Sequence, residues 1–293
     1  MEQFNNLTLE EKSYIYGFLL TDGNVYFKNT DIYDGQISLE ISKRDEDIID
    51  KICGLLVSGR KSERTRKTNF KEDCCSVRFR SCNRQLLKDL IDFGFPVSNK
   101  TLNAHPPLVE YDKNAFWRGV IDGDGAIGVA KNEKTNGQPF LTLATKSELL
   151  KNEFCKYLSE ITNKKYNPNL SKRDNIYNIS CGNHSCCSVL RMLYKNATIY
   201  LDRKYKKYLD CLKWEENSKK NKLRSSNTSG VEGVSFRKKS DKWMAYIRIN
   251  GERKYLGTFD NKKDAIRARL KSEKEYYGEL AKQARLFEEY NII

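Results

Sequence analysis

The chain has 293 residues and carries 53 Lys and Arg against 39 Asp and Glu, a formal net charge of +14. This balance favours a polyanionic partner over an acidic small molecule, and the length allows more than one hydrophobic core. No apolar stretch approaches the ~20 residues of a membrane span, and the opening MEQFNNLTLEEK lacks the basic flank and apolar run of a secretory signal, so we expect a cytoplasmic protein with no membrane partner.

The first predicted elements follow the order αββαββα. Thr8 and Glu11 stand at capping-box spacing before a helix that runs to Asp22, and Gly23 suits the end of that helix. Alternating apolar and polar residues then predict strands over 24–30 and 35–42, and an amphipathic pattern predicts a helix over 45–56. A second strand pair over 62–70 and 74–82 and a helix over 83–94 complete the first half, residues 1–110.

The second half, residues 111–215, repeats this order. A helix ends at Asp124, strands are predicted over 126–132 and 139–145, and a helix over 147–161. Further strands near 164–172 and 175–181 and helices over 186–194 and 202–214 follow. Gly17 and Asp22 match Gly119 and Asp124 at an offset of 102 residues, and the corners beginning at Ser81 and Ser180 match at an offset of 99. These two anchors predict a duplicated domain.

The two aspartates stand where a helix disfavours them. The C-terminal end of a helix carries partial negative charge and disfavours a carboxylate by up to about 1 kcal/mol, so a Lys or Arg partner or a bound cation is expected beside each. A calcium-binding loop starting at Asp122 is disfavoured because Ala126 and Ile127 occupy positions that need a ligand and a glycine. A simple turn remains an alternative. Asp122 has no counterpart, since Leu20 occupies the equivalent position.

The paired stretches GFLLTDG and GVIDGDG, each opening an αββαββ half, resemble the single-chain LAGLIDADG homing endonucleases over residues 8–214. The resemblance implies an α+β fold of two pseudo-symmetric αββαββα halves that form a saddle of antiparallel sheets. It implies that the motif helices cross closely at Gly17 and Gly119, and that Asp22 and Asp124 are catalytic residues that bind Mg²⁺, with Mn²⁺ or Ca²⁺ fitting the same site. The family also places a lysine at the end of the second strand of each half, here Lys43 or Arg44 and Lys146.

Residues that contact DNA in this part of the chain are predicted from strand alternation. Side chains on the solvent face of the first-half strands would enter the major groove, and the candidates are Gln36, Ser38, Arg78 and Arg80, with Arg44 near the active centre.

A polar, basic segment over 216–230 is predicted to be a linker. The following residues, 231–293, resemble the Apetala-two type DNA-binding domain, through GV, WMAYIR, YLGTF and a closing helix over 264–281. Alternation places Val234, Phe236, Trp243, Ala245, Ile247 and Leu256 on the face under the helix. The predicted DNA-binding residues on the other face, besides Ser235, are Arg237, Tyr246, Arg248, Arg253 and Tyr255. Residues 217–293 carry 19 Lys and Arg and 10 Asp and Glu, more than half of the net charge.

These observations predict a monomeric, metal-dependent, site-specific double-strand DNA endonuclease of the homing type with no small-molecule substrate. The resemblance implies cleavage across the minor groove. The alternative is a DNA-binding regulator or an RNA splicing maturase that keeps the fold without cleavage. The chain has nine cysteines and no CxxC pair, so we expect reduced thiols; a zinc site at Cys181, His184, Cys186 and Cys187 is the less favoured alternative.

Overall fold

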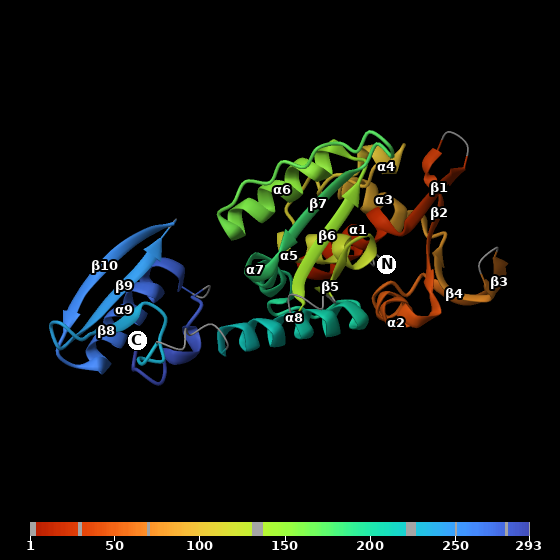
Figure 1. Cartoon of the computed structure of the whole chain (residues 1–293). Helices are drawn as coiled ribbons and strands as arrows, with labels where there is room; N and C mark the ends of the chain where they lie inside the picture. Colours follow the sequence, from red (N-terminus) through yellow and green to blue (C-terminus); the bar gives the residue numbers. More distant parts are fainter. Residues whose placement is uncertain are drawn as a thin grey trace. The chain divides into compact units, whose positions relative to one another are not determined.

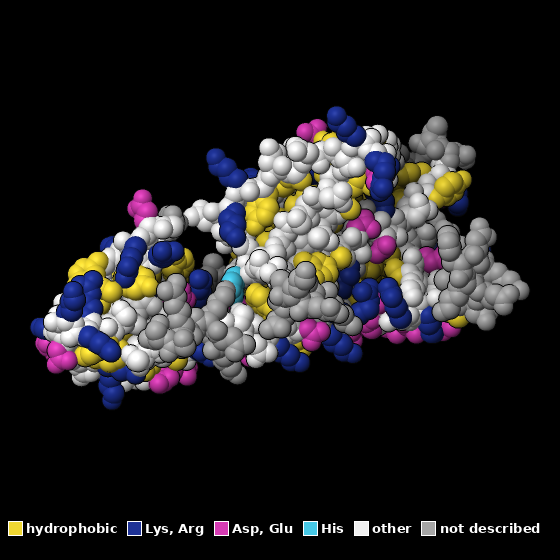
Figure 2. Space-filling model, viewed as in Figure 1, with side chains coloured by type: hydrophobic (Ala, Val, Ile, Leu, Met, Phe, Trp, Pro, Cys, Tyr) yellow, Lys and Arg dark blue, Asp and Glu magenta, His cyan; other side chains and the backbone are white. Residues whose placement is uncertain are grey.

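The computed structural model describes residues 4–28, 31–68, 71–130, 137–220, 227–249, 251–278 and 281–292 (Figure 1). The chain divides into two compact units, residues 1–215 and 216–293. Lys and Arg side chains are spread over the visible face of both units (Figure 2). Within the described ranges, every helix is too short or too polar to cross a bilayer.

The first half of unit 1 contains a four-stranded antiparallel sheet in the order β1-β2-β4-β3. Thr8 caps the first helix in a full capping box with Glu11. Buried Ile37, Leu39, Val77 and Phe79 alternate along β2 and β4, and α2 and α3 cover this apolar face. The elements are α1 (Leu9–Thr21), β1 (Gly23–Lys28), β2 (Asp31–Ser42), η1 (Lys43–Asp45), α2 (Glu46–Leu55), β3 (Arg60–Thr68), β4 (Lys71–Ser81), α3 (Arg84–Asp92) and α4 (Lys100–Asn103).

The second half contains a three-stranded antiparallel sheet in the order β5-β6-β7. Its apolar face carries Leu141, Leu143 and Ile179, and α6 and α7 pack on it. The elements are α5 (Lys113–Gly123), β5 (Ala126–Ala130), β6 (Gln138–Thr145), α6 (Glu148–Thr162), β7 (Tyr177–Gly182), α7 (Asn183–Tyr194) and α8 (Asp202–Lys220). Helix α8 therefore continues into the segment predicted to be a linker.

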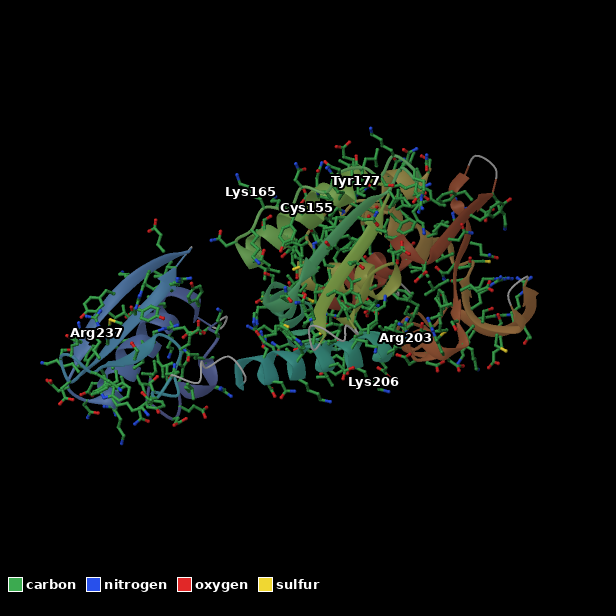
Figure 3. All side chains as sticks on the ribbon, in the orientation of Figure 1. Cys155, Lys165, Tyr177, Arg203, Lys206 and Arg237 are labelled. Atoms are coloured by element: carbon green, nitrogen blue, oxygen red, sulfur yellow. The ribbon has the colours of Figure 1, made fainter. Side chains whose placement is uncertain are left out.

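The strand predicted near 164–172 is wrong. This segment forms an irregular connection with a single bridge between Leu170 and Tyr177, so the second half has the order αββαβαα among its described residues. Its sequence NKKYNPNLSK explains the difference, because Pro168 lacks a backbone donor and the asparagines favour turns over a ladder. Lys165 extends away from this connection (Figure 3). The ends of the predicted strands at 29–30, 69–70 and 131–132 lie outside the described residues.

Helices α1 and α5 cross at the centre of unit 1 (Figure 1). A Cβ atom added at Gly17 would lie 2.4 Å from the carbonyl oxygen of Phe116, and one added at Gly119 would lie 2.2 Å from that of Tyr14. Only glycine permits this backbone approach at both positions. Around the crossing, one hydrophobic core joins both halves and includes Tyr14, Phe18, Trp117 and Val120.

Unit 2 is a three-stranded antiparallel sheet in the order β10-β9-β8 with one helix packed on it. Its elements are β8 (Val234–Arg237), β9 (Lys242–Ile249), β10 (Glu252–Phe259), α9 (Lys262–Tyr277) and a short 3-10 turn, η3 (Ala284–Leu286). Val234, Ala245, Ile266 and Leu270 form its small core. The sheet and single helix agree with the predicted fold of this region.

Candidate active site at the paired helix ends

Asp22 and Asp124 occupy the C-cap positions of α1 and α5 in the same conformation. Their φ and ψ angles are −83° and −13° at Asp22 and −85° and −12° at Asp124. In each case the backbone N–H donates to carbonyls of the last helical turn. Asp22 donates to Phe18 and Leu19, and Asp124 donates to Val120 and Ile121. The local sequence therefore repeats the same helix end twice.

The crossing of α1 and α5 brings the two carboxylates to one centre. An atom added as a Cβ at Gly123 would lie 3.1 Å from Oδ2 of Asp22, so the end of α5 abuts this side chain. Burial and then the negative charge of Asp124 raise the pKa of Asp22 to about 6. Burial also raises the pKa of Asp124, although Lys100 and Lys204 oppose this. The folded protein thus holds two carboxyl groups close together in surroundings that disfavour their ionised forms.

Two lysines that the sequence patterns did not indicate lie at these helix ends. The ammonium group of Lys100 donates to the carbonyls of Leu19 and Thr21, at 3.3 and 2.7 Å, and to that of Gly23. Burial lowers the pKa of Lys100, against the opposing charges of Asp124 and Asp22. A positive group caps the end of α1, as the helix dipole requires.

Lys204 caps the C-terminal end of α5 in the same way. Its ammonium group donates to the carbonyls of Asp122 and Gly125, each at 2.7 Å, and also to those of Ile121 and Gly123. Lys204 is buried, and burial lowers its pKa to about 8. A weak sequence signal existed, because Lys100 and Lys204 follow Asp22 and Asp124 by the similar distances of 78 and 80 residues.

Two cavities flank the paired carboxylates, of about 170 Å³ beside Asp124 and about 310 Å³ beside Asp22. Each combines the end of one motif helix with the aspartate of the other and the end of a strand. The linings correspond at the repeat offset of 102, with the pairs Thr21 and Gly123, Asp22 and Asp124, Ile41 and Leu143, Ser42 and Ala144, and Arg44 and Lys146. The duplication therefore builds two related centres.

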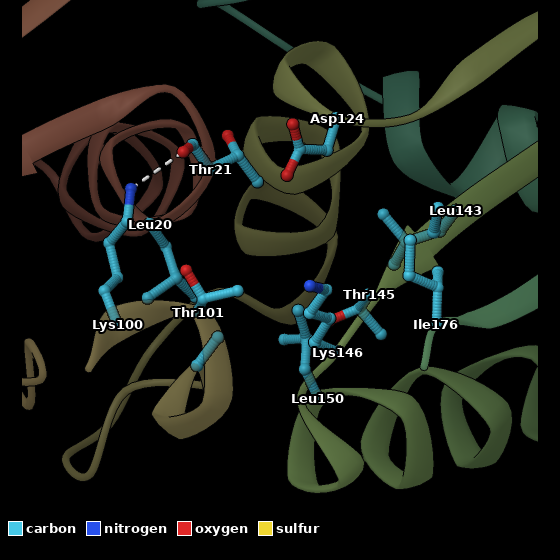
Figure 4. A pocket seen from close by; sticks show the side chains of 12 residues that line it. Leu20, Thr21, Lys100, Thr101, Asp124, Leu143, Thr145, Lys146, Leu150 and Ile176 are labelled. Carbon is cyan, nitrogen blue, oxygen red and sulfur yellow. Dashed lines mark hydrogen bonds between the residues drawn. The ribbon is translucent and has the colours of Figure 1, made fainter. Parts of the chain in front are cut away.

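Two of the three predicted basic residues, Lys146 and Arg44, line the cavities, and Lys43 does not. Lys146 lines the cavity beside Asp124, and the two side chains point toward the same space from opposite sides (Figure 4). Arg44 lines the cavity beside Asp22. Lys43 is not among the residues that line the cavity beside Asp22; its ammonium group pairs with Glu46 at 2.8 Å and with Glu63. The geometry favours Arg44 over Lys43 as the counterpart of Lys146, and a catalytic role for Lys43 stays a prediction.

Asp122, the aspartate without a counterpart, is a buried structural group. It accepts hydrogen bonds from the hydroxyls of Tyr14 at 2.8 Å and Tyr194 at 3.2 Å and from the backbone N–H of Leu201 at 2.8 Å. Burial raises its pKa, while Lys204 opposes this. These contacts tie α1, α5 and α7 to the start of α8, and they fix the position of Lys204.

A half-buried ion pair joins the two halves beside the larger cavity. Arg203 on α8 donates from Nε and Nη2 to the two carboxylate oxygens of Asp45, at 2.7 and 2.9 Å. Although burial acts to raise the pKa of Asp45, the hydrogen bonds and charge of Arg203 hold it below its ordinary value. This bidentate pair links the start of α8 to η1, the turn that follows β2 of the first sheet.

The predicted strand residues share the solvent face of the first sheet. Arg80 is exposed and Gln36 is half-buried, and the Ser38 hydroxyl lies 3.4 Å from the carbonyl of Asn24. Arg78 is engaged with Glu40 through Nε at 2.9 Å and through Nη2. Arg80 is therefore the more accessible of the two arginines.

In unit 2, the predicted contact residues lie side by side on one face of the sheet. Tyr246 pairs with Tyr255 and Arg248 with Arg253 across β9 and β10, and the Arg253 guanidinium lies 3.7 Å from the Tyr246 ring centroid. Arg237 is exposed at the end of β8. On the opposite face, Phe236 is 39% exposed and contacts the Trp243 ring, so it lies at the edge of the core.

The cysteine-rich segment belongs to the core of unit 1. Cys186 and Cys187 on α7 are buried, and His184 contacts Glu215, with 3.2 Å between Nδ1 and Oε1. In the described part of the chain, no three His, Cys, Asp or Glu side chains come together in a way suited to a metal ion.

Substituting Lys204 with Met should destabilise unit 1 by about 2–3 kcal/mol, because buried helix-end carbonyls lose their donor. Lys206→Met is the matched control, since Lys206 lies on the exposed side of the same helix (Figure 3). Urea denaturation of both variants measures the difference. Equal stability of the two variants would show that Lys204 does not cap α5.

The raised pKa of Asp22 predicts a pH-dependent stability difference in EDTA. In the folded protein the Asp22 carboxyl stays protonated up to about pH 6, whereas in an unfolded chain it loses its proton near pH 4. Relative to Asp22→Asn, the wild-type protein should lose stability as the pH rises between these values. The gap should reach about 1 kcal/mol at neutral pH, after discounting for the solvent exposure of the side chain. Urea denaturation across this range tests it, and a gap independent of pH would contradict it.

Neither a family model nor a curated protein matches the chain. Among solved structures, a variant of the meganuclease I-SmaMI aligns with 74% of this chain and 93% of its own, at 12% identity and a TM-score of 0.51. The LAGLIDADG meganuclease I-AabMI, bound to uncleaved DNA, aligns with 73% and 92%, at 13% identity and a TM-score of 0.48. The homing endonuclease I-WcaI, bound to its DNA recognition sequence, aligns with 69% and 87%, at 16% identity and a TM-score of 0.46. The likeness to I-SmaMI shows a shared fold.

Proposed function

We propose that the chain is a LAGLIDADG-type homing endonuclease, a monomer that cuts both strands of duplex DNA at a specific site with the help of a divalent cation. The observation that carries the proposal is the pair of aspartates, Asp22 and Asp124, brought together by the glycine crossing of α1 and α5. The fold shared with the meganuclease I-SmaMI supports it.

The donor set fits magnesium. Mg²⁺ keeps several waters and takes few protein carboxylates together with substrate phosphates, and this centre offers two carboxylates. Burial raises the pKa of both carboxyls, and the charge of Asp124 further raises that of Asp22, so a bound cation would favour the ionised form of both. When bound, the cation would neutralise charge on the scissile phosphate and favour an activated water. Mn²⁺ or Ca²⁺ would fit the same oxygens.

The protein's own cations would act on the phosphates beside this pair. Lys146 and Arg44 line the two related cavities, one toward each aspartate, and would stabilise the developing negative charge of one strand each. Lys100 and Lys204 fix the helix ends and lower the cost of ionising both aspartates. The two sheets would lie along the major groove, with Gln36, Ser38 and Arg80 as contacts.

Unit 2 would be an Apetala-two type DNA-binding module. Its outer sheet face gathers Arg248, Arg253, Tyr246 and Tyr255, with Arg237 at its edge. Arginine and aromatic side chains on one face suit contacts to phosphates and base edges. A tethered module of net positive charge would raise the concentration of unit 1 near its target.

The test is cleavage of a library of duplex DNA by the purified full chain with Mg²⁺. The proposal expects double-strand cuts at one sequence that disappear in EDTA. Specific binding without cuts, in Mg²⁺ and in Mn²⁺, would overturn the nuclease and would favour a DNA-binding regulator or a splicing maturase.

A further inference from the structure

The solvent faces of the two sheets in unit 1 differ in charge. On the first sheet this face carries Lys28, Arg60, Arg64, Arg78 and Arg80, together with the acids Asp34, which pairs with Lys28, and Glu40, which Arg78 binds. On the second sheet it carries no charged side chain among the residues that the structure describes. Pairing across β6 and β7 places on it Gln138, Phe140, Thr142, Ala144, Asn178 and Ser180, and β5 adds only alanine and glycine.

Register places two of the arginines directly opposite each other. Arg60 on β3 pairs with Arg80 on β4, and Ser38 lies on the other side of Arg80. Both arginines are exposed, and within the described part of the chain neither forms an ion pair. Like charges directly opposite on a sheet are destabilising, so this pair suits an acceptor-rich or anionic partner. A guanine edge fits, because arginine binds its O6 and N7 atoms in a bidentate way.

The second sheet offers another kind of contact. Side chains that present methyl groups or a ring, such as Thr142, Ala144 and Phe140, suit the C5-methyl group of thymine. Asn178 and Gln138 are exposed, and amide side chains bind the N6 and N7 atoms of adenine in a bidentate way. In Figure 2 the surface over β6 and β7 is mostly white and yellow, with blue at its margins.

Resting on the proposed function, we infer that the DNA target is asymmetric in composition. The half-site read by β1–β4 contains guanines contacted by Arg60 and Arg80, and the half-site read by β5–β7 is rich in A·T pairs contacted by Thr142 and Asn178. The two cavities beside Asp22 and Asp124 are therefore alike, whereas the solvent faces of the two sheets, which would contact the DNA bases, differ.

The experiment is a binding selection from randomised duplexes by the full chain in EDTA, so that cleavage does not enter. The selected sites are compared for the wild-type protein, Arg80→Ala, Asn178→Ala and the control Lys156→Ala, whose side chain is exposed on α6. Arg80→Ala should reduce affinity for the selected site about tenfold and remove guanine preference in one segment. Asn178→Ala should remove adenine preference in a different segment, and Lys156→Ala should change neither.

Two results would overturn the inference. One is guanine preference of equal strength in the segments altered by Arg80→Ala and Asn178→Ala. The other is an Arg80→Ala variant that loses affinity equally for all sequences, which marks a phosphate contact. If no duplex is enriched at all, the proposed function itself fails. In both overturning results duplexes are still enriched, so failure of this inference is distinguished from failure of the proposed function.

Discussion

Substituting Asn for Asp22 or Asp124 should reduce double-strand cleavage by about 10³-fold or more, because each change removes a carboxylate from the centre that would hold the cation. The rate is measured on the site recovered from the cleavage library, under single-turnover conditions with Mg²⁺. Since each aspartate faces one of the two related cavities, residual product from a single variant should be nicked in one strand, and the nicked strand should differ between the two variants.

The variants should fold and bind normally. Asparagine keeps the shape of the side chain, and it removes a carboxylate whose raised pKa shows that its charge is unfavourable in the folded protein. Thermal stability should therefore be equal or higher, and DNA affinity in EDTA should be retained. Asp92→Asn is the matched control, because Asp92 is an exposed aspartate at the end of α3, outside the centre. Full cleavage by either active-centre variant would remove that aspartate from the reaction.

Gly119→Ala should destabilise unit 1 by about 3 kcal/mol. The added Cβ would lie 2.2 Å from the carbonyl oxygen of Tyr14 and 2.9 Å from the backbone nitrogen of Phe18. Both are backbone atoms of α1, so no side chain can move aside, and the two helices must separate. Because Asp22 and Asp124 lie at the ends of these helices, cleavage should fall together with stability.

Gly54→Ala provides the control for this prediction. Gly54 lies in helix α2 with no other atom within 4 Å of an added Cβ, so the same change there should stabilise the helix by about 0.5–1 kcal/mol. Urea denaturation of both variants measures the contrast, with the unfolding of unit 2 as an internal reference. Opposite effects are expected, and equal small effects would mean that the helices do not cross at Gly119.

Features that depend on neighbouring residues and on repetition could be predicted from the amino-acid sequence. Capping at Thr8, alternation along β2 and β4, and the helix ends at Asp22 and Asp124 were predictable because each rests on a few adjacent side chains. The offset of 102 residues indicated the duplication without any structural information. The sheet and helix of unit 2 were predictable in the same way. The prediction of a strand near 164–172 was wrong. It rested on the repeat of the first half, whereas the local residues, Pro168 among them, oppose a strand.

The set of charged side chains that meet at the ends of α1 and α5 depends on the packing of distant segments and could not be predicted from the sequence. Lys100 and Lys204 bind carbonyls about 80 residues away along the chain, so no local pattern marks them as helix caps. The choice of Arg44 as the counterpart of Lys146 depends on which side chain turns toward the cavity, and Lys43 turns to Glu46 and Glu63 instead. Short-range patterns fix helices, strands and their ends, whereas burial, pKa shifts and ion pairs arise when distant segments exclude water from one another.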